Sequence, residues 1–288
     1  METDLDSQHR GRVTKDGIRI HKPEDFGGMR AAGALAARIL DEVAPLVTPG
    51  QTTAEIDRVI TEMVEAAGAT SATIGYRGYQ HASCISVNHV VCHGIPGSPI
   101  PKYKMEKAPR GNDVLVDGDI LNIDVTVIFD GWYGDTSRMF VAGRPKPFAQ
   151  KLIQVTHDAL MKGIEAVRPG NTFGDIGAAI QQFVEAQRMS VVRDFCGHGI
   201  GTVFHAPPNV LHYGRPGTGA TLEEGMFFTI EPMVNLGRPE TKVLSDDWTA
   251  ITRDKTLSAQ FEHSVGVTAD GCEIFTPSPA GRFHPTWA

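Results

Sequence analysis

The sequence is poor in cysteine and has no long hydrophobic run. Its four cysteines form no CxxC pair, which excludes a zinc finger and indicates reduced thiols in a cytosolic protein. No apolar stretch approaches the roughly eighteen residues that span a bilayer, and the polar first residues, METDLDSQHRGR, contain no secretory signal. We therefore expect a cytoplasmic protein that does not associate with membranes.

Basic residues are also too few to indicate a nucleic-acid-binding protein. The 288 residues include 27 Lys and Arg against 34 Asp and Glu, a net charge of −7, so DNA is not an expected partner. Residues 97–118 are a local exception, because Lys102, Lys104, Lys107 and Arg110 cluster there among prolines and glycines. We predict a solvated loop, and a transient contact with an acidic partner such as ribosomal RNA is the alternative.

An internal repeat without gaps is the most informative pattern. Residues 47–66, VTPGQTTAEIDRVITEMVEA, align on 167–186, VRPGNTFGDIGAAIQQFVEA, with nine of the twenty positions identical. Each copy contains Pro-Gly, then an N-cap threonine, Thr52 or Thr172, and then apolar residues at helical spacing. A further amphipathic helix precedes each copy, at about 26–47 and 148–167. Two copies are too few for a solenoid, so we predict one pseudo-symmetric domain.

The stretch 122–137, NIDVTVIFDGWYGDTS, predicts a β-hairpin whose two acidic residues share a face. Asp130-Gly131 suits a two-residue type I′ turn, because both positions require a positive φ. The resulting register pairs Phe129 with Trp132, Thr126 with Asp135, and Asp124 with Ser137. Asp124 and Asp135 are then diagonal neighbours, about 7–8 Å apart at the backbone. Two converging carboxylates in a low-dielectric site require a cation or a proton between them.

The second half carries matching elements, because each half has a His-Gly-Ile segment followed by two acidic strands. If a two-fold axis relates the halves, Asp124 and Asp135 meet Glu231 and Glu262 at that axis. Four carboxylates favour two divalent ions over one. His198, between two glycines, is the natural neutral ligand. A cysteine-free, oxygen-rich shell favours Mn, Fe(II) or Co over a structural zinc.

Each of these residues has a structural alternative when it is taken alone. Asp135 could be a turn residue or an ion-pair partner, Glu231 before Pro232 could end an edge strand, and Glu262 could lie on a solvated face. GHGIG at 197–201 is not a phosphate-binding loop, because its spacing is not GxGxxG and no helix signal follows. Their equivalent positions in the repeat favour the metal site.

The motifs together closely resemble the type I methionine aminopeptidase family of the bacterial type, which has the pita-bread fold. They are HGIP at 93–96, NIDVT with GDTSRMF, GHGIG followed by FHAPP, TIEPMV, and SAQFEHSVGVT. The resemblance covers residues 26 to 276 and implies an α+β fold of two halves related by a pseudo-two-fold, with antiparallel sheets inside and helices outside. We accordingly expect residues 1–25 to be a short N-terminal extension and 26–288 to be a single catalytic domain.

The resemblance also implies a metal-dependent activity. It implies co-translational removal of the N-terminal methionine from nascent proteins, with a small second residue preferred and two divalent ions (Fe(II), Mn, Co or Zn) lowering the pKa of a shared water. The implied metal ligands are Asp124, Asp135, His198, Glu231 and Glu262. We expect a monomer that acts on the N-termini of nascent chains.

Three residues are assigned chemical roles by the resemblance. Glu231 is the implied proton shuttle, His205 would contact the substrate carbonyl or its developing oxyanion, and His93 would contact the scissile amide nitrogen or the leaving amine. The implied methionine pocket consists of Tyr76, Tyr79, Cys84, Phe204 and Trp248. Thr73 stands where many relatives carry cysteine, and the 97–118 loop, which is long for the family, is expected to shape the mouth of the site.

Two other functions are compatible with the same fold. A prolidase or aminopeptidase P shares the five ligands, but such relatives carry an additional N-terminal domain for which this chain has no room. A catalytically inactive pita-bread protein that binds RNA or protein partners typically loses ligands, whereas all five are present here. Metal content and substrate preference distinguish the three.

Overall fold

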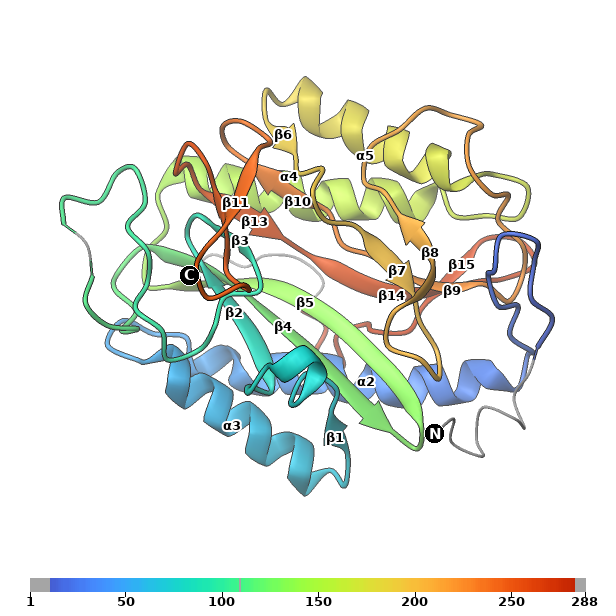
Figure 1. The fold of residues 1–288 in the computed structure, drawn as a ribbon, viewed down its shortest axis with the longest axis horizontal. Coiled ribbons are helices and arrows are strands. Elements are labelled where there is room, and N and C mark those ends of the chain that lie inside the picture. Colours follow the sequence, from blue (N-terminus) through green and yellow to red (C-terminus); the bar gives the residue numbers. More distant parts are fainter. Residues whose placement is uncertain (1–10, 109, 283–288) are drawn as a thin grey trace.

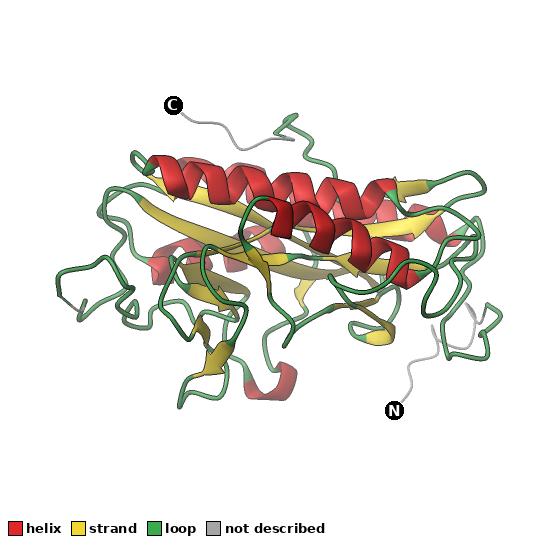
Figure 2. Ribbon diagram, turned by 90° about the horizontal axis from the view of Figure 1, so that it is seen from above, coloured by secondary structure: helices red, strands yellow, loops and turns green. Residues whose placement is uncertain are grey.

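The helices form two pairs that lie along one side of the sheets (Figures 1 and 2). The computed structural model describes residues 11–108 and 110–282. Its helices are α2 (Asp25–Val43), the 3₁₀ helix η1 (Ala44–Leu46), α3 (Thr53–Ala66), the 3₁₀ turn η2 (Tyr76–Gly78), α4 (Pro147–Glu165) and α5 (Phe173–Ala186). The predicted duplication of a helix pair is confirmed. No helix in the described part of the chain is long and apolar enough to cross a membrane.

Both helices of the internal repeat begin at the predicted N-cap threonine. Thr52 Oγ1 accepts a hydrogen bond from the backbone N–H of Glu55 at 3.2 Å. At Thr172 the capping box is complete, since the Asp175 carboxylate also accepts from the Thr172 backbone N–H at 2.7 Å. These caps satisfy donors that a helix N-terminus would otherwise leave unpaired.

The large central sheet joins strands from both halves of the chain. Its order is β1-β4-β5-β14-β9-β7-β8, with β2 also paired to β4 and β15 to β14. Its strands are β1 (Thr70–Ser71), β2 (Ser83–Val87), β4 (Asp119–Phe129), β5 (Trp132–Ala142), β7 (Gly197–Gly199), β8 (Ala206–Val210), β9 (Phe227–Ile230), β14 (Glu262–Val267) and β15 (Cys272–Ile274). The antiparallel pairing of β5 with β14 is the seam between the halves.

The remaining strands form two small sheets. One has the order β13-β10-β6 and the other β11-β12-β3. Their strands are β3 (Val90–Cys92), β6 (Ser190–Val191), β10 (Met233–Asn235), β11 (Thr241–Val243), β12 (Ala250–Thr252) and β13 (Ser258–Gln260). Since β3 belongs to the first half and β12 to the second, this small sheet is another connection between them.

The β4–β5 hairpin has the predicted turn and register. Asp130 and Gly131 have φ values of 47° and 80°, as a type I′ turn requires. Asp124 is paired with Ser137, and Thr126 is paired with Asp135. The two aspartates therefore lie on one face of the sheet, as predicted.

The described part of the predicted N-terminal extension, 11–25, packs against the second half of the chain. Ile18 is 1% exposed and belongs to the core formed with α4 and α5. The His21 backbone N–H donates to the carbonyl oxygen of Gly225 at 2.8 Å. Residues 1–10 of the predicted extension lie outside the described residues.

Candidate metal centre and active site

Three of the predicted ligands come together on adjacent strands around Ser137. Ser137 on β5 is paired with Asp124 on β4 at one edge and with Glu262 on β14 at the other. Asp135 is two residues before Ser137, so alternation along the strand places it on the same face. Asp135 Oδ1 accepts a hydrogen bond from Thr126 Oγ1 at 2.8 Å, which fixes one carboxylate oxygen.

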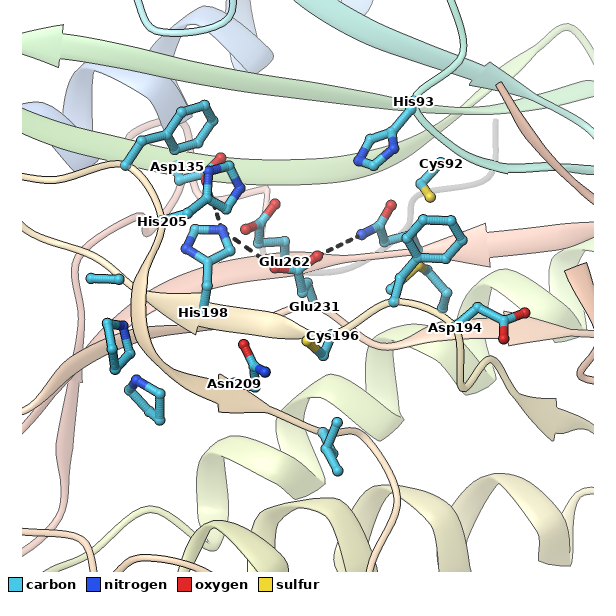
Figure 3. Close-up of a pocket in the computed structure, with 18 of the residues that line it drawn as sticks. Cys92, His93, Asp135, Asp194, Cys196, His198, His205, Asn209, Glu231 and Glu262 are labelled. Atoms are coloured by element: carbon cyan, nitrogen blue, oxygen red, sulfur yellow. Dashed lines mark hydrogen bonds and ion pairs between the residues drawn. The ribbon is translucent and has the colours of Figure 1, made fainter. Parts of the chain in front are cut away.

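The other two predicted ligands approach from the second half. His198 lies on β7, and Glu231 is the first residue after β9 and not within a strand as the sequence predicted. His198 Nε2 lies 3.5 Å from Asp135 Oδ2 and 3.7 Å from Glu231 Oε1. Figure 3 shows these side chains pointing toward one another, with Glu262 beside them.

The glycines beside His198 allow β7 to run close to its neighbours. A Cβ on Gly197 would lie 2.4 Å from the Thr229 carbonyl oxygen, and one on Gly199 would lie 2.1 Å from the Pro207 carbonyl oxygen. Both separations are shorter than a real contact permits. The strand that carries His198 therefore requires glycine on each side of it, as the sequence indicated.

The donor atoms of this cluster fit a divalent cation. One ligand atom each from Asp135, His198 and Glu262 lie within 4.8 Å of one another. Asp124 Oδ1 is buried and has no hydrogen-bond partner among the described residues. His198 Nδ1 lies 3.2 Å from the Gly199 carbonyl oxygen, so this nitrogen donates its proton there and Nε2 is left to face the carboxylates, where it could offer its lone pair to a bound ion. Oxygen donors with one imidazole suit first-row divalent metals.

The carboxylates repel one another when no cation is present. Burial, followed by the charges of Asp135 and Glu231, raises the pKa of Asp124 well above its usual range. Burial and the neighbouring acids, Asp135 first, do the same to the pKa of Glu262. Burial raises the pKa of Glu231 to about 7, and Asp135 adds to that shift. Raised pKa values of all three acids are expected of a buried site that binds a positive charge.

His198 responds in the opposite way to the acids. Burial lowers its pKa, but the hydrogen bond to Asp135 and the charges of Glu231 and Asp135 outweigh that effect, so the pKa is raised overall. A proton on the imidazole thus takes the position that a cation would occupy.

All twelve residues predicted for the site line one cavity of about 1160 Å³. They are Tyr76, Tyr79, Cys84, His93, Asp124, Asp135, His198, Phe204, His205, Glu231, Trp248 and Glu262. The cavity has a polar part around the carboxylates and an aromatic part beside them. The structure brings these residues together, and their individual roles stay predictions.

The two non-ligand histidines flank the carboxylates. The ring of His205 lies 4.2 Å from that of His198, between centroids, and is open to the cavity. Partial burial, followed by the charge of His198, lowers the pKa of His205 to about 4. Burial also lowers the pKa of His93. Both rings are therefore neutral at pH 7, and each can donate one N–H.

The aromatic part of the cavity contains the residues predicted for the methionine pocket. Tyr79 and Trp248 have ring centroids 4.9 Å apart, and Tyr76 and Phe204 have centroids 5.1 Å apart. Cys84 on β2 is paired with Asp124 on β4, so its thiol lies next to the carboxylate cluster. An apolar, polarisable wall beside the metal ligands suits an unbranched thioether side chain.

Some cavity residues were missed by the sequence analysis. Cys92, Phe195, Met233 and Gln260 also line the cavity, and Gln260 Nε2 donates to Glu231 Oε2 at 3.3 Å. Cys92 precedes His93, and Gln260 precedes Glu262 by two residues, so proximity in sequence was an available signal for both. Thr73 lines the cavity too, but its hydroxyl donates to the His81 carbonyl oxygen at 2.7 Å.

The 97–118 loop lies away from the site. None of its described residues lines the cavity, so the expectation that it shapes the mouth is not confirmed. Arg110 binds both carboxylate oxygens of Asp119 at 2.5 Å and also pairs with Glu106. These ion pairs fold the loop back onto the start of β4.

Four carboxylates and an imidazole at the wall of a cavity, on strands from two pseudo-symmetric halves, define a metal-dependent hydrolase. Comparison with known proteins makes this specific. The chain belongs to metallopeptidase family M24, whose model matches residues 27–269. A divalent metal is therefore implied both by the family and by the cluster of Asp135, His198 and Glu262.

Relatives match nearly the whole chain. Methionine aminopeptidase from Rickettsia prowazekii is 53% identical over 272 residues, which cover 94% of this chain and 99% of the relative. A crystal structure of methionine aminopeptidase from that organism has a TM-score of 0.83 and covers 90% of this chain and 99% of its own. Methionine aminopeptidase from Escherichia coli K12 is 49% identical over 260 residues, 90% of this chain and 94% of the relative.

A more distant structure shares the fold alone. Prolidase from Pyrococcus horikoshii has a TM-score of 0.66 and 18% identity, and the match covers 89% of this chain but 63% of the prolidase. Together these structures confirm the predicted α+β pita-bread fold.

Proposed function

We propose that this chain is a methionyl aminopeptidase that removes the N-terminal methionine from nascent proteins in the cytoplasm and prefers a small second residue. One observation carries the proposal. The five predicted ligands, the two neutral histidines and an aromatic, thiol-bearing pocket all line a single cavity. Relatives that match almost the entire length of this M24 chain are methionine aminopeptidases.

The proposed metal centre holds two ions. Asp124, Asp135, His198, Glu231 and Glu262 would bind them, and the charge of four carboxylates supports two ions over one. The two ions would be Fe(II), Mn, Co or Zn. When bound, the ions supply Lewis-acid polarisation of the substrate and an activated water.

The protein residues around the centre have distinct proposed tasks. Glu231, a carboxylate at the wall of the metal centre, is the proposed group that would accept a proton from the attacking water and pass it to the leaving amine. The neutral ring of His205 donates to the substrate carbonyl oxygen as negative charge develops there. His93 donates to the scissile nitrogen or the leaving amine. Tyr79, Trp248 and their neighbours hold the methionine side chain.

The proposal also covers the partners. Nascent chains would present their N-termini to a monomeric enzyme, and a transient ribosome contact would use the 97–118 loop. Lys104 and Lys107 are exposed there, whereas Arg110 is engaged by Glu106 and Asp119. The basic surface available to an acidic partner is therefore smaller than the sequence indicated.

A substrate comparison tests the function. The purified protein, loaded with Mn(II) or Fe(II), is assayed with Met-Ala-Ser and with an Xaa-Pro peptide. We expect hydrolysis of Met-Ala-Ser, no cleavage of Xaa-Pro, and loss of activity in strong chelator. Cleavage of Xaa-Pro alone would establish a prolidase-like enzyme, and full activity in chelator would reject a metal-dependent mechanism.

A further inference from the structure

The backbone of Glu231 is held by a buried histidine that the proposed mechanism does not use. The Glu231 N–H donates to Nε2 of His212 at 3.0 Å. Strand β9 ends at Ile230, and Glu231 has no paired residue on β14. The next residue, Pro232, has no N–H of its own. The imidazole therefore replaces the strand carbonyl that would otherwise fix the chain where Glu231 enters the cavity.

The hydrogen bond from the Glu231 N–H determines which nitrogen of His212 carries the proton. Because Nε2 accepts a hydrogen bond, the ring is neutral and carries its proton on Nδ1. His212 is 0% exposed, and Nδ1 has no hydrogen-bond partner among residues 11–108 and 110–282. A buried, unpaired donor costs about 1–3 kcal/mol. An apolar side chain would fill the space without that cost, so packing alone does not favour histidine here.

The loop that carries His212 is held tightly against α5. A Cβ on Gly177 would lie 2.4 Å from the Tyr213 carbonyl oxygen and 2.8 Å from the Leu211 carbonyl oxygen. These carbonyls belong to the residues on either side of His212. Glycine on this face of α5 therefore sets how far His212 reaches toward Glu231.

The corresponding position of the first repeat copy supports this reading. Gly177 aligns with Asp57 on α3, whose Oδ1 accepts from the Ser83 backbone N–H at 2.9 Å. Ser83 precedes Cys84, which is paired with Asp124. The same repeat position therefore holds a segment beside a predicted acidic ligand in both halves. In the first half Asp57 hydrogen-bonds the strand next to Asp124, and in the second half Gly177 packs closely against the loop that contacts Glu231.

We propose that His212 is a positioning residue for Glu231. Its Nε2 fixes the backbone of Glu231, so that the carboxylate stays directed toward His198 and Gln260. The metal-affinity part of the inference needs only the predicted ligand role of Glu231. The kinetic part rests on the proposed aminopeptidase function.

Two amide variants of His212 test the inference. The side-chain oxygen of His212→Gln falls near the place of Nε2 and can accept from the Glu231 N–H, whereas that of His212→Asn falls near Nδ1 and cannot. For each variant, Mn(II) affinity is measured by calorimetry, and kcat and KM are measured with Met-Ala-Ser at full metal occupancy. We expect His212→Asn to lose about 10- to 100-fold in metal affinity or kcat with little change in KM, and His212→Gln to retain most of both.

A second pair of variants leaves His212 itself unchanged. Gly177→Ala should push the 211–213 loop away from α5 and lower Mn(II) affinity or kcat in the same direction. Gly27→Ala on α2 is the matched control, because a Cβ there meets nothing within 4 Å. If His212→Asn does not fold, the comparison of Gly177→Ala with Gly27→Ala still tests the positioning role of His212.

The outcomes separate positioning from a purely structural role. If His212→Asn keeps wild-type metal affinity and kcat and loses only thermal stability, or if His212→Gln is impaired as much as His212→Asn, the inference is overturned. If the wild-type protein does not hydrolyse Met-Ala-Ser, the proposed function fails. The difference in Mn(II) affinity between the two variants then still tests the positioning role.

Discussion

At the scale of single residues, similar side chains in one cavity have different proposed tasks. His198 and His205 have ring centroids 4.2 Å apart. His198 lies between Asp135 and Glu231, and its pKa is raised by them. His205 has its pKa lowered to about 4. One ring is thus suited to a cation site, and the other is suited to donating a neutral N–H.

Replacing His205 should separate catalysis from metal binding. We expect His205→Ala to bind Mn(II) like the wild type while kcat falls by roughly 10²- to 10³-fold, because loss of one transition-state donor costs about that much. His205→Asn, which can still donate, should recover part of the rate. Calorimetry and steady-state kinetics on Met-Ala-Ser measure both quantities. Loss of metal in His205→Ala would show that the ring is a ligand.

Replacing Asp135 should have the reverse effect. Asp135→Asn removes a charge from the centre of the cluster, and we expect Mn(II) affinity to fall by at least tenfold while the chain still folds. The metal-free variant should be more stable than the metal-free wild type, because one repelling carboxylate is gone. Asp130→Asn in the β4–β5 turn is the control, since asparagine tolerates its positive φ. Unchanged metal affinity in Asp135→Asn would remove Asp135 from the ligand set.

At the scale of elements, the site depends on how closely the strands approach. Gly199 on β7 has no room for a side chain, because a Cβ would meet the Pro207 carbonyl oxygen on β8 at 2.1 Å. We expect Gly199→Ala to lower the free energy of unfolding by about 1–3 kcal/mol and to weaken Mn(II) binding by displacing His198. Gly111→Ala, at a position with nothing within 4 Å, should change neither. Denaturant unfolding and calorimetry measure these effects, and wild-type values for Gly199→Ala would contradict them.

Local rules explain why the sequence predicted most elements. The Asp130-Gly131 turn fixes the hairpin register, and the register fixes the face of Asp124 and Asp135. The repeat then required the second-half acids to meet them, and the β5–β14 pairing does bring Glu262 beside Ser137. Each of these steps follows from the period of a strand or from turn geometry.

Contacts from distant loops could not be predicted in the same way. His212 shows no periodic pattern that places it beside Glu231, since this contact depends on where the chain lies after it leaves β8. The basic cluster at 97–118 was likewise ambiguous. Whether Arg110 faces solvent or pairs with Asp119 is decided by tertiary packing that short-range propensity does not encode.

At the scale of the whole molecule, acids from both halves are buried where the halves join. In the metal-free chain, burial and mutual repulsion raise the pKa values of Asp124, Glu231 and Glu262. These three acids therefore bind more protons in the folded state than in the unfolded state above about pH 4.5, where free carboxylates have lost theirs. The raised pKa of His198 has the same sign at higher pH. Acids with lowered pKa values, such as Asp41 and Asp175, act only below about pH 4.

These acids should therefore make the metal-free protein less stable as pH rises from 5 to 8. Burial lowers the pKa values of His89, His205, His212 and His263 to about 3 or 4, so these histidines act in the opposite direction between about pH 4 and 7. The contribution of the acids is therefore measured as a difference, between metal-free and metal-bound protein and between wild type and variant. Glu231, with a pKa of about 7, contributes a loss on the order of 3 kcal/mol over this range. Bound Mn(II) neutralises the same carboxylates, so the gain in melting temperature on adding metal should grow with pH. Thermal unfolding with and without Mn(II) at pH 5, 6, 7 and 8 measures this gain.

Glu231→Gln is the matched variant for this experiment, because it removes the titrating group and keeps the shape of the side chain. Because the histidines are present in both proteins, the metal-free melting temperature of Glu231→Gln relative to that of the wild type should rise as pH increases from 5 to 8. If neither this difference nor the gain on adding Mn(II) changed with pH, the buried acids would not be repelling one another across the junction. The cation would then have no electrostatic role in joining the two halves, and the case for a metal centre at this junction would fail with it.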